Sequence, residues 1–115
     1  MSADCLFCKI IAGELPSNKV YSDEEVIAFE DIAPAAPTHI LVIPTRHIGA
    51  INEVEADDQA LLGKLLLVAN NIARERGLDD DGFRYVINTG EDGGQTVGHI
   101  HLHILAGRQM TWPPG

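Results

Sequence analysis

The sequence is organised around a short stretch in which histidine and aliphatic residues alternate. His99, His101 and His103 occupy every second position, with isoleucine and leucine between them. This alternation predicts a β-strand, because successive side chains of a strand point to opposite faces of a sheet. We therefore expect residues 98–105 to form a strand whose aliphatic side chains enter the core and whose three imidazoles share the other face.

Three imidazoles on one face also predict a functional site. They account for three of the five histidines in the chain, and neighbours on one face of a strand lie roughly 6.5–7 Å apart. At that spacing one imidazole can attack a bound group while its neighbours donate hydrogen bonds or protons to it. Titratable side chains gathered in this way usually mark a site.

Composition limits what kind of protein this can be. A chain of 115 residues, 45% hydrophobic and 22% charged, fits one soluble domain over residues 1–115. No apolar run approaches the ~20 residues that cross a bilayer, and the first four residues lack the basic region of a signal peptide. We expect a cytoplasmic protein without a membrane partner. The net charge of −9 argues against a nucleic-acid partner, but a small phosphate ligand remains possible.

Periodicity and turn residues predict an α+β fold. Apolar residues at helical spacing indicate a short helix over residues 5–12, capped by Asp4 and ended by Gly13, and a long helix over residues 57–76. Besides the histidine stretch, strands are expected at residues 19–21, 26–29, 38–43 and 83–87. Since most of these strands follow one another directly, we expect an antiparallel sheet.

The histidine stretch follows a glycine-rich loop at residues 88–98. Its flexible backbone, amides and hydroxyls suit the oxygens of a phosphate group. A neutral imidazole whose other nitrogen is held by a hydrogen bond can attack phosphorus, so we expect His101 to be the nucleophile. His103 is the candidate proton donor to the leaving group.

The only cysteines are Cys5 and Cys8, spaced as Cys-x-x-Cys. A disulfide at this spacing in a reducing compartment would be catalytic or transient, and no thioredoxin-like strand precedes the pair. Metal binding is therefore the favoured interpretation.

Taken together, these motifs resemble the histidine triad (HIT) superfamily, whose signature is His-x-His-x-His-x-x with hydrophobic x. The resemblance extends over nearly the whole chain, and three further segments are similar to the nucleotide-binding Hint branch: residues 7–11, 37–44 and 107–115. It implies a HIT-like fold, with a five-stranded antiparallel sheet, one long and one short helix, and a homodimer in which two sheets join into a ten-stranded one. The C-terminal residues 107–115 would lie at the dimer interface.

The resemblance implies a reaction, namely hydrolysis of the P–N bond of purine nucleoside 5′-phosphoramidates to AMP or GMP and an amine. His101 would form a covalent nucleotidyl-histidine, His103 would assist the leaving group, and His39 would support the triad that His99 completes. Asp31 would bind the ribose hydroxyls, and Trp112 would shape the leaving-group side from the partner protomer. The remaining nucleotide-binding residues implied are Leu6, Phe7, Ile10, Phe29, Ile32 and Leu41 around the purine, and Asn88, Gly94, Gln95, Thr96 and Val97 around the phosphate.

The resemblance also implies a structural zinc ion. Some bacterial members with the same Cys-x-x-Cys hold zinc with two histidines, which here gives Cys5, Cys8, His47 and His99. Four protein ligands leave no open position for water, so such a site would be structural rather than catalytic. It would clamp the first helix to the histidine strand.

Two features of the phosphate loop bear on the substrate: one weakens the assignment to the Hint branch, and the other favours monophosphate-linked substrates. Thr96 stands where the Hint branch commonly has serine, and Gln-Thr-Val is more usual in dinucleoside polyphosphate hydrolases of the Fhit branch. Glu91 and Asp92 would repel polyphosphates if they faced the ligand. The alternatives are a dinucleoside polyphosphate hydrolase, a largely non-catalytic nucleotide-binding regulator, and metal-dependent hydrolysis at the cysteine–histidine cluster.

Overall fold

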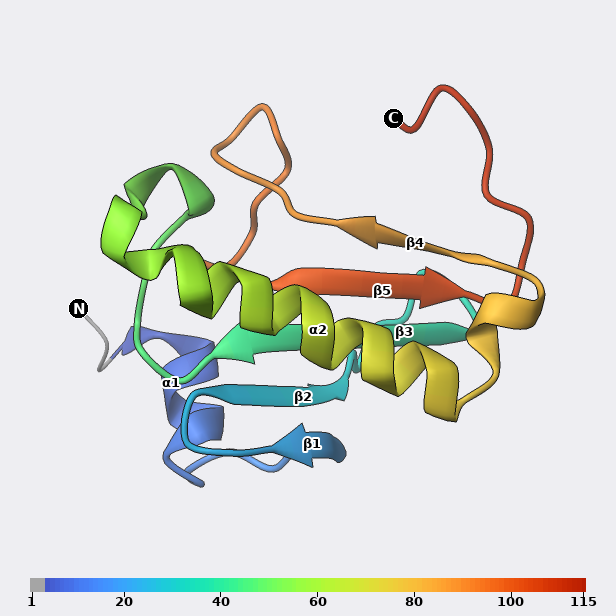
Figure 1. Cartoon of the computed structure of the whole chain (residues 1–115). Helices are drawn as coiled ribbons and strands as arrows, with labels where there is room; N and C mark the ends of the chain where they lie inside the picture. Colours follow the sequence, from blue (N-terminus) through green and yellow to red (C-terminus); the bar gives the residue numbers. More distant parts are fainter. Residues whose placement is uncertain (1–3) are drawn as a thin grey trace.

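Five antiparallel strands form one sheet with a helix on each face (Figure 1). The computed structural model describes residues 4–115, so the expectation about residues 1–3 lies outside the described part. The strands are β1 (Lys19–Ser22), β2 (Val26–Glu30), β3 (Thr38–Pro44), β4 (Phe83–Val86) and β5 (Leu102–Ala106), in the order β1-β2-β3-β5-β4. The helices are α1 (Leu6–Ile11) and α2 (Gln59–Glu75), with 3-10 turns η2 (Ile51–Glu53), η3 (Ala56–Asp58) and η4 (Leu78–Asp80). The predicted α+β class and five-stranded antiparallel sheet are confirmed.

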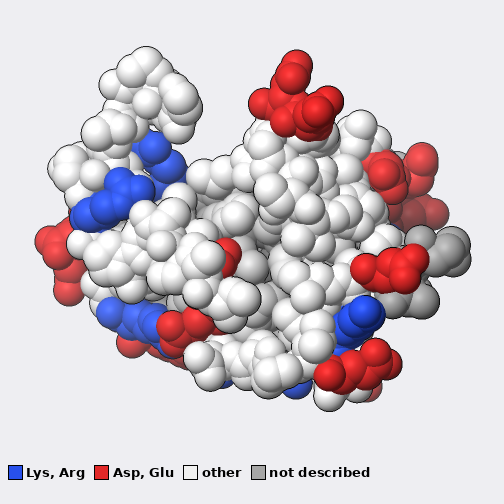
Figure 2. Space-filling model, turned by 180° about the vertical axis from the view of Figure 1, so that it is seen from behind, with Lys and Arg blue, Asp and Glu red and all other residues white. Residues whose placement is uncertain are grey.

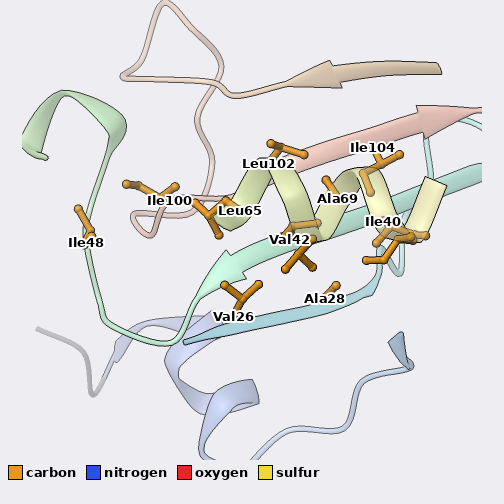
Figure 3. Packing of buried hydrophobic residues seen from close by; sticks show 12 residues of the cluster. Val26, Ala28, Ile40, Val42, Ile48, Leu65, Ala69, Ile100, Leu102 and Ile104 are labelled. Atoms are coloured by element: carbon orange, nitrogen blue, oxygen red, sulfur yellow. The ribbon is translucent and has the colours of Figure 1, made fainter. Parts of the chain in front are cut away.

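The central strands β2 and β3 are apolar on both faces because both faces are covered. Alternate residues such as Val26 and Val42 pack with α2 in one core cluster (Figure 3). Their neighbours Ile27 and Ile43 pack with α1 in a second cluster on the opposite face. The sheet is therefore the middle of three layers, and the face that carries α1 is the one on which the site lies.

Local capping explains where both helices begin and where α2 ends. In α1 the Sγ of Cys5 accepts the N–H of Cys8, so Cys5 rather than the predicted Asp4 is the N-cap. Helix α2 follows η3, whose capping box joins Glu55 to Asp58. The helix ends where Gly77 adopts φ +70, a left-handed conformation that glycine tolerates best.

The histidine strand is shorter than the alternation predicted. β5 begins at Leu102, so only His103 lies within it, and His99 and His101 precede it. The backbone N–H of Ile100 donates to the carbonyl of Ile48 at 2.8 Å instead of entering the sheet ladder. The side-chain alternation survives nonetheless, because Ile100 and Leu102 enter the core against α2.

Within residues 4–115, no helix combines the length and apolar character needed to span a bilayer.

Candidate functional site

Three imidazoles, those of His39, His101 and His103, lie together on the α1 face of the sheet, near the junction of β3 and β5. His103 on β5 is paired with Leu41 on β3, and His39 lies diagonally across from it. The ring centroids of His101 and His103 are 4.9 Å apart, and those of His39 and His103 are 5.1 Å apart. Strand register thus brings residues 64 positions apart in sequence into one group.

The tautomer of His101 follows from its hydrogen bond. Its Nδ1 lies 2.7 Å from the backbone carbonyl oxygen of His99. A carbonyl can only accept, so Nδ1 carries the proton and the lone pair of the neutral ring lies on Nε2. His101 is 5% exposed and lines the pocket described below. Its Nε2 is therefore available as a nucleophile.

A chain of hydrogen bonds fixes His103 in the same way. The backbone N–H of Ala35 donates to Nδ1 of His39 at 2.9 Å, which places the proton of His39 on Nε2. That N–H donates to Nδ1 of His103, also at 2.9 Å. The proton of neutral His103 then lies on Nε2, which is buried and has no hydrogen-bond partner within residues 4–115. This Nε2–H group is therefore free to donate a hydrogen bond to a ligand in the pocket.

Burial favours the neutral form of His39 and His103. Desolvation, followed by the nearby His101 and His39, lowers the pKa of His103 to about 4, although Asp31 opposes the shift. Desolvation also lowers the pKa of His39, with Asp31 again opposing. The carboxylate of Asp31 lies 3.5 Å from Nε2 of His39. At neutral pH, His103 is thus a neutral hydrogen-bond donor, because its low pKa leaves almost none of the imidazolium form that could give up a full proton.

A pocket of about 450 Å³ opens beside the two catalytic candidates. Its walls are largely apolar and come from α1, β2 and β3, while its polar end holds His101, His103, Asp31 and Thr96. The molecular face seen in Figure 2 is mostly free of charged groups over its middle, with acidic and basic side chains around the rim. An apolar slot that ends in imidazoles and the carboxylate of Asp31 suits a flat ring joined to a polar group.

A second group of ligand-type atoms lies at the N-terminal end of α1. The ligand atoms of Cys5, Cys8, His47 and His99 all lie within 4.8 Å of one another. The Sγ of Cys5 is 3.4 Å from Nδ1 of His99, and the Sγ of Cys8 is 3.2 Å from Nδ1 of His47. The two Nδ1 atoms are 3.2 Å apart.

These distances fit a tetrahedral metal. Zn–N and Zn–S bonds of ordinary length give tetrahedral edges of about 3.3 Å between two nitrogens and about 3.6 Å between nitrogen and sulfur. The tautomer fits too, because Nε2 of His99 donates to the carbonyl of Pro44 at 2.9 Å and leaves the lone pair on Nδ1. Burial lowers the pKa of His99, which keeps this ring neutral. The residues present therefore fit a divalent metal such as zinc.

Comparison with known proteins agrees with this geometry. The HIT domain profile matches residues 12–110. This chain belongs to the HIT family. An uncharacterized HIT-like protein of Synechococcus elongatus is 54% identical over 115 residues, which is all of both chains.

Solved structures of HIT proteins share the fold closely. A HIT family hydrolase from Legionella pneumophila is 54% identical, with a TM-score of 0.95 over 97% of this chain and 100% of that one. A histidine triad protein from Clostridium difficile is 47% identical, with a TM-score of 0.91 over 94% of each chain. A histidine triad nucleotide-binding protein from Candida albicans is 31% identical, with a TM-score of 0.82 over 96% of this chain and 83% of that one.

Most of the residues that the HIT resemblance implied around a nucleotide lie at the pocket. Its lining includes His101 and His103 together with Phe7, Ile10, Phe29, Asp31, Ile32, Leu41, Thr96 and Val97. His39 lies behind His103 rather than in the lining, as a supporting residue would. His99 points to the cysteines instead and is not part of the pocket lining.

Four other implied residues are not part of the pocket lining: Asn88, Gly94, Gln95 and Trp112. The amide of Gln95 donates to the carbonyls of Gly49 and Val97 and accepts the N–H of Gly90, so it braces the loop. Trp112 is 80% exposed. The motif could not predict that Gln95 stabilises the loop or that the Trp112 ring is exposed, because each depends on how segments distant in sequence pack together.

The acidic residues of the loop do not face the pocket. Glu91 and Asp92 are both exposed and absent from the lining. Exposed charges are screened by water and salt, so the expected repulsion of polyphosphates loses most of its force.

Sequence reasoning missed part of the lining. Leu15, Pro16, Ser17 and Glu30 also border the pocket. The first three follow α1 in a segment that carries no motif, and only the packing of that segment against β2 brings them there. No signal in the sequence separates them from an ordinary turn.

Proposed function

We propose that this HIT protein hydrolyses purine nucleoside 5′-phosphoramidates to the nucleoside monophosphate and an amine. The observation that carries the proposal is the complementary pair of tautomers. His101 offers a lone pair on Nε2, and His103 offers an N–H on Nε2, at the polar end of one apolar pocket. A nucleophile beside a preorganised donor is what attack on a phosphoryl centre requires.

The first step forms a covalent intermediate. Nε2 of His101 attacks the α-phosphorus and forms a P–N bond, and the substrate's own P–N bond breaks. The electron pair of the broken bond goes to the amine, which takes a proton from solvent. The carbonyl of His99 stabilises the positive charge that develops on the His101 ring through the Nδ1–H bond.

The second step returns the enzyme to its starting state. Water attacks phosphorus, releases a proton to solvent, and the electron pair of the P–Nε2 bond returns to His101. In both steps the N–H of His103 donates to a phosphoryl oxygen. Its low pKa favours this hydrogen-bonding role over the full proton transfer expected from the sequence.

The walls of the pocket supply binding and orientation. Phe7 and Phe29 meet edge-to-face, with ring centroids 5.6 Å apart, and form one side of the slot proposed for the purine. The carboxylate of Asp31 can accept from both ribose hydroxyls. The Thr96 hydroxyl and the N–H groups after Gly94 are the proposed phosphate contacts of the loop.

The proposal includes a structural zinc ion held by Cys5, Cys8, His47 and His99. When bound, the ion would clamp α1 to the segment before β5, with no position left open for water. It takes no part in the steps above.

We also propose a homodimer with a purine nucleotide as its small-molecule partner. Large apolar side chains are exposed on the single chain, among them Ile87 at 39% and Trp112 at 80%. Apolar side chains favour a protein interface where they gather in one patch. Sedimentation equilibrium of the wild type tests the stoichiometry directly.

A single-turnover assay tests the reaction. Wild type and His101→Ala are mixed with a fluorogenic adenosine phosphoramidate, quenched without acid and analysed by intact mass. We expect one adenylate adduct on the wild type and none on the variant. AMP binding without turnover or adduct would leave a nucleotide-binding regulator, and the enzyme claim would be withdrawn.

A substrate comparison separates the two hydrolase alternatives. Since Glu91 and Asp92 are exposed, charge gives little reason to exclude a dinucleoside polyphosphate. A higher kcat/KM for diadenosine triphosphate or tetraphosphate than for the phosphoramidate would favour a polyphosphate hydrolase. Loss of turnover on chelation, with folding unchanged, would favour metal-dependent hydrolysis instead.

A further inference from the structure

The C-terminal segment after β5 is fastened to the proline-containing loop at residues 34–37. Arg108 donates from Nε and Nη2 to the carbonyl of Ala35, at 3.2 and 3.1 Å. Next to it, Gly107 adopts φ +96, and a Cβ added there would lie 2.7 Å from Cβ of Pro37. The close approach and the positive φ both require glycine, so the chain is built to bring Arg108 onto this loop.

Ala35 is also where the hydrogen-bond chain of the site begins. Its N–H donates to Nδ1 of His39, and the opposite nitrogen of His39 donates to Nδ1 of His103. The chain ends on the buried Nε2 of His103 in the pocket. Ala35 thus connects the exposed Arg108 to the Nε2–H group of His103 at the pocket.

We propose that Arg108 is a positioning residue for His103, which it controls through Ala35 and His39. By holding the carbonyl of Ala35, the guanidinium keeps the N–H of the same residue aimed at His39. This contact fixes both imidazoles as Nε2–H tautomers. The effect on catalysis rests on the proposed function, whereas the effect on the tautomers does not.

The consequence of losing this contact follows from proton counting. Without the Ala35 N–H, His39 can hold its proton on Nδ1 and become an acceptor at Nε2. The bond between the two rings then requires the proton of His103 on Nδ1. Nε2 of His103 would present a lone pair to the phosphoryl oxygens and would repel them. Asp31, 3.5 Å from Nε2 of His39, favours the original arrangement but touches neither Ala35 nor His103 in the hydrogen-bond network.

A second arginine supplies a matched control. Arg84 on β4 donates from Nη2 to the carbonyl of Thr111 at 2.9 Å, so it also fastens the C-terminal segment. It makes no contact with Ala35 in that network. Arg84→Ala should loosen the segment without reaching the imidazoles, and it therefore separates a merely structural role of Arg108 from a positioning one.

The experiment is a histidine tautomer measurement by long-range ¹H–¹⁵N correlation at neutral pH on ¹⁵N-histidine protein. We expect His39 and His103 to be Nε2–H tautomers in wild type and in Arg84→Ala. In Arg108→Ala both should become mixtures, and Arg108→Lys should restore the wild-type tautomers in part. A pure Nε2–H state of both rings in Arg108→Ala would overturn the proposal. If Arg108→Ala fails to fold, Arg108→Gln, which keeps most of the aliphatic stem, is judged by the same criterion.

Kinetics then test the catalytic consequence. We expect kcat for the phosphoramidate to fall about tenfold in Arg108→Ala, with KM within twofold of wild type, and to change little in Arg84→Ala. An unchanged kcat despite mixed tautomers would overturn the catalytic half of the proposal. Wild type without any turnover would count against the proposed function, while the tautomer spectra would still decide the role of Arg108.

Discussion

The ring of Phe7 stands edge-on to the imidazole of His99, with centroids 5.9 Å apart and ring planes inclined by 77°. The same ring is edge-on to His101, at 5.1 Å and 82°. One aromatic side chain thus contacts a proposed metal ligand and the proposed nucleophile, and it also lines the apolar pocket. Phe7 lies between Cys5 and Cys8 in the sequence, which ties its position to that of the two cysteines. The state of the cluster should therefore influence ligand binding.

Removing one thiolate should weaken the pocket as well as the metal site. Cys8→Ala spares the N-cap sulfur of Cys5, and we expect it to lose zinc and to raise the Kd for AMP by roughly three- to tenfold, about 1 kcal/mol. Metal analysis and calorimetric titration check both effects. Lys9→Ala on the same helix is the control. Unchanged AMP affinity in a zinc-free variant would refute the coupling.

Ile32 should contribute to binding without contributing to stability. It lines the pocket and yet is 94% exposed in the chain without ligand. Ile32→Ala removes apolar surface that only a ligand would cover, so the Kd for AMP should rise about fivefold, or roughly 1 kcal/mol. The thermal midpoint should stay within a degree or so. Leu67→Ala, on the opposite face of the sheet, should leave the affinity unchanged.

Asp31 should determine the preference for ribose over deoxyribose. Its Oδ1 accepts the N–H of Ala33 at 2.8 Å, which Asn can preserve. Asp31→Asn removes the charge that favours bonds from two hydroxyls, so kcat/KM for the ribonucleoside phosphoramidate should fall roughly tenfold. The 2′-deoxy substrate should lose much less. Equal losses for both substrates would argue that the carboxylate does not read the sugar.

The low pKa of His103 predicts acid sensitivity of the fold. The ring stays neutral in the folded protein down to about pH 4, whereas in the unfolded chain it gains a proton near pH 6.5. Between these values the unfolded state binds more protons, so the free energy of unfolding falls as pH drops and levels off below about 4. Between pH 7 and pH 5, the free energy of unfolding of His103→Gln should therefore fall by about 1–2 kcal/mol less than that of the wild type. Urea denaturation of both proteins at both pH values measures these changes. An equal fall in the free energy of unfolding for wild type and variant would contradict this expectation.

The fold could be predicted largely from local patterns in the sequence. The alternation around His101 and the apolar spacing of residues 57–76 depend only on neighbours in sequence, and the sheet and α2 follow them closely. The exceptions arose at element ends. β5 begins at Leu102 because Ile100 bonds to Ile48, and a contact over such a distance in sequence has no local signature.

The roles of individual histidines divide in the same way. The sequence alone determined which side chains could do chemistry and that they share one face of the sheet, because strand geometry repeats every two residues. The HIT resemblance already grouped His99 with the cysteines, as the structure does, but only the tertiary structure decided that His103 presents an N–H to the pocket. The physical reason is that a tautomer is set by whichever group meets the other ring nitrogen. Here those groups are the carbonyls of Pro44 and His99 and the N–H of Ala35, which only folding brings into place.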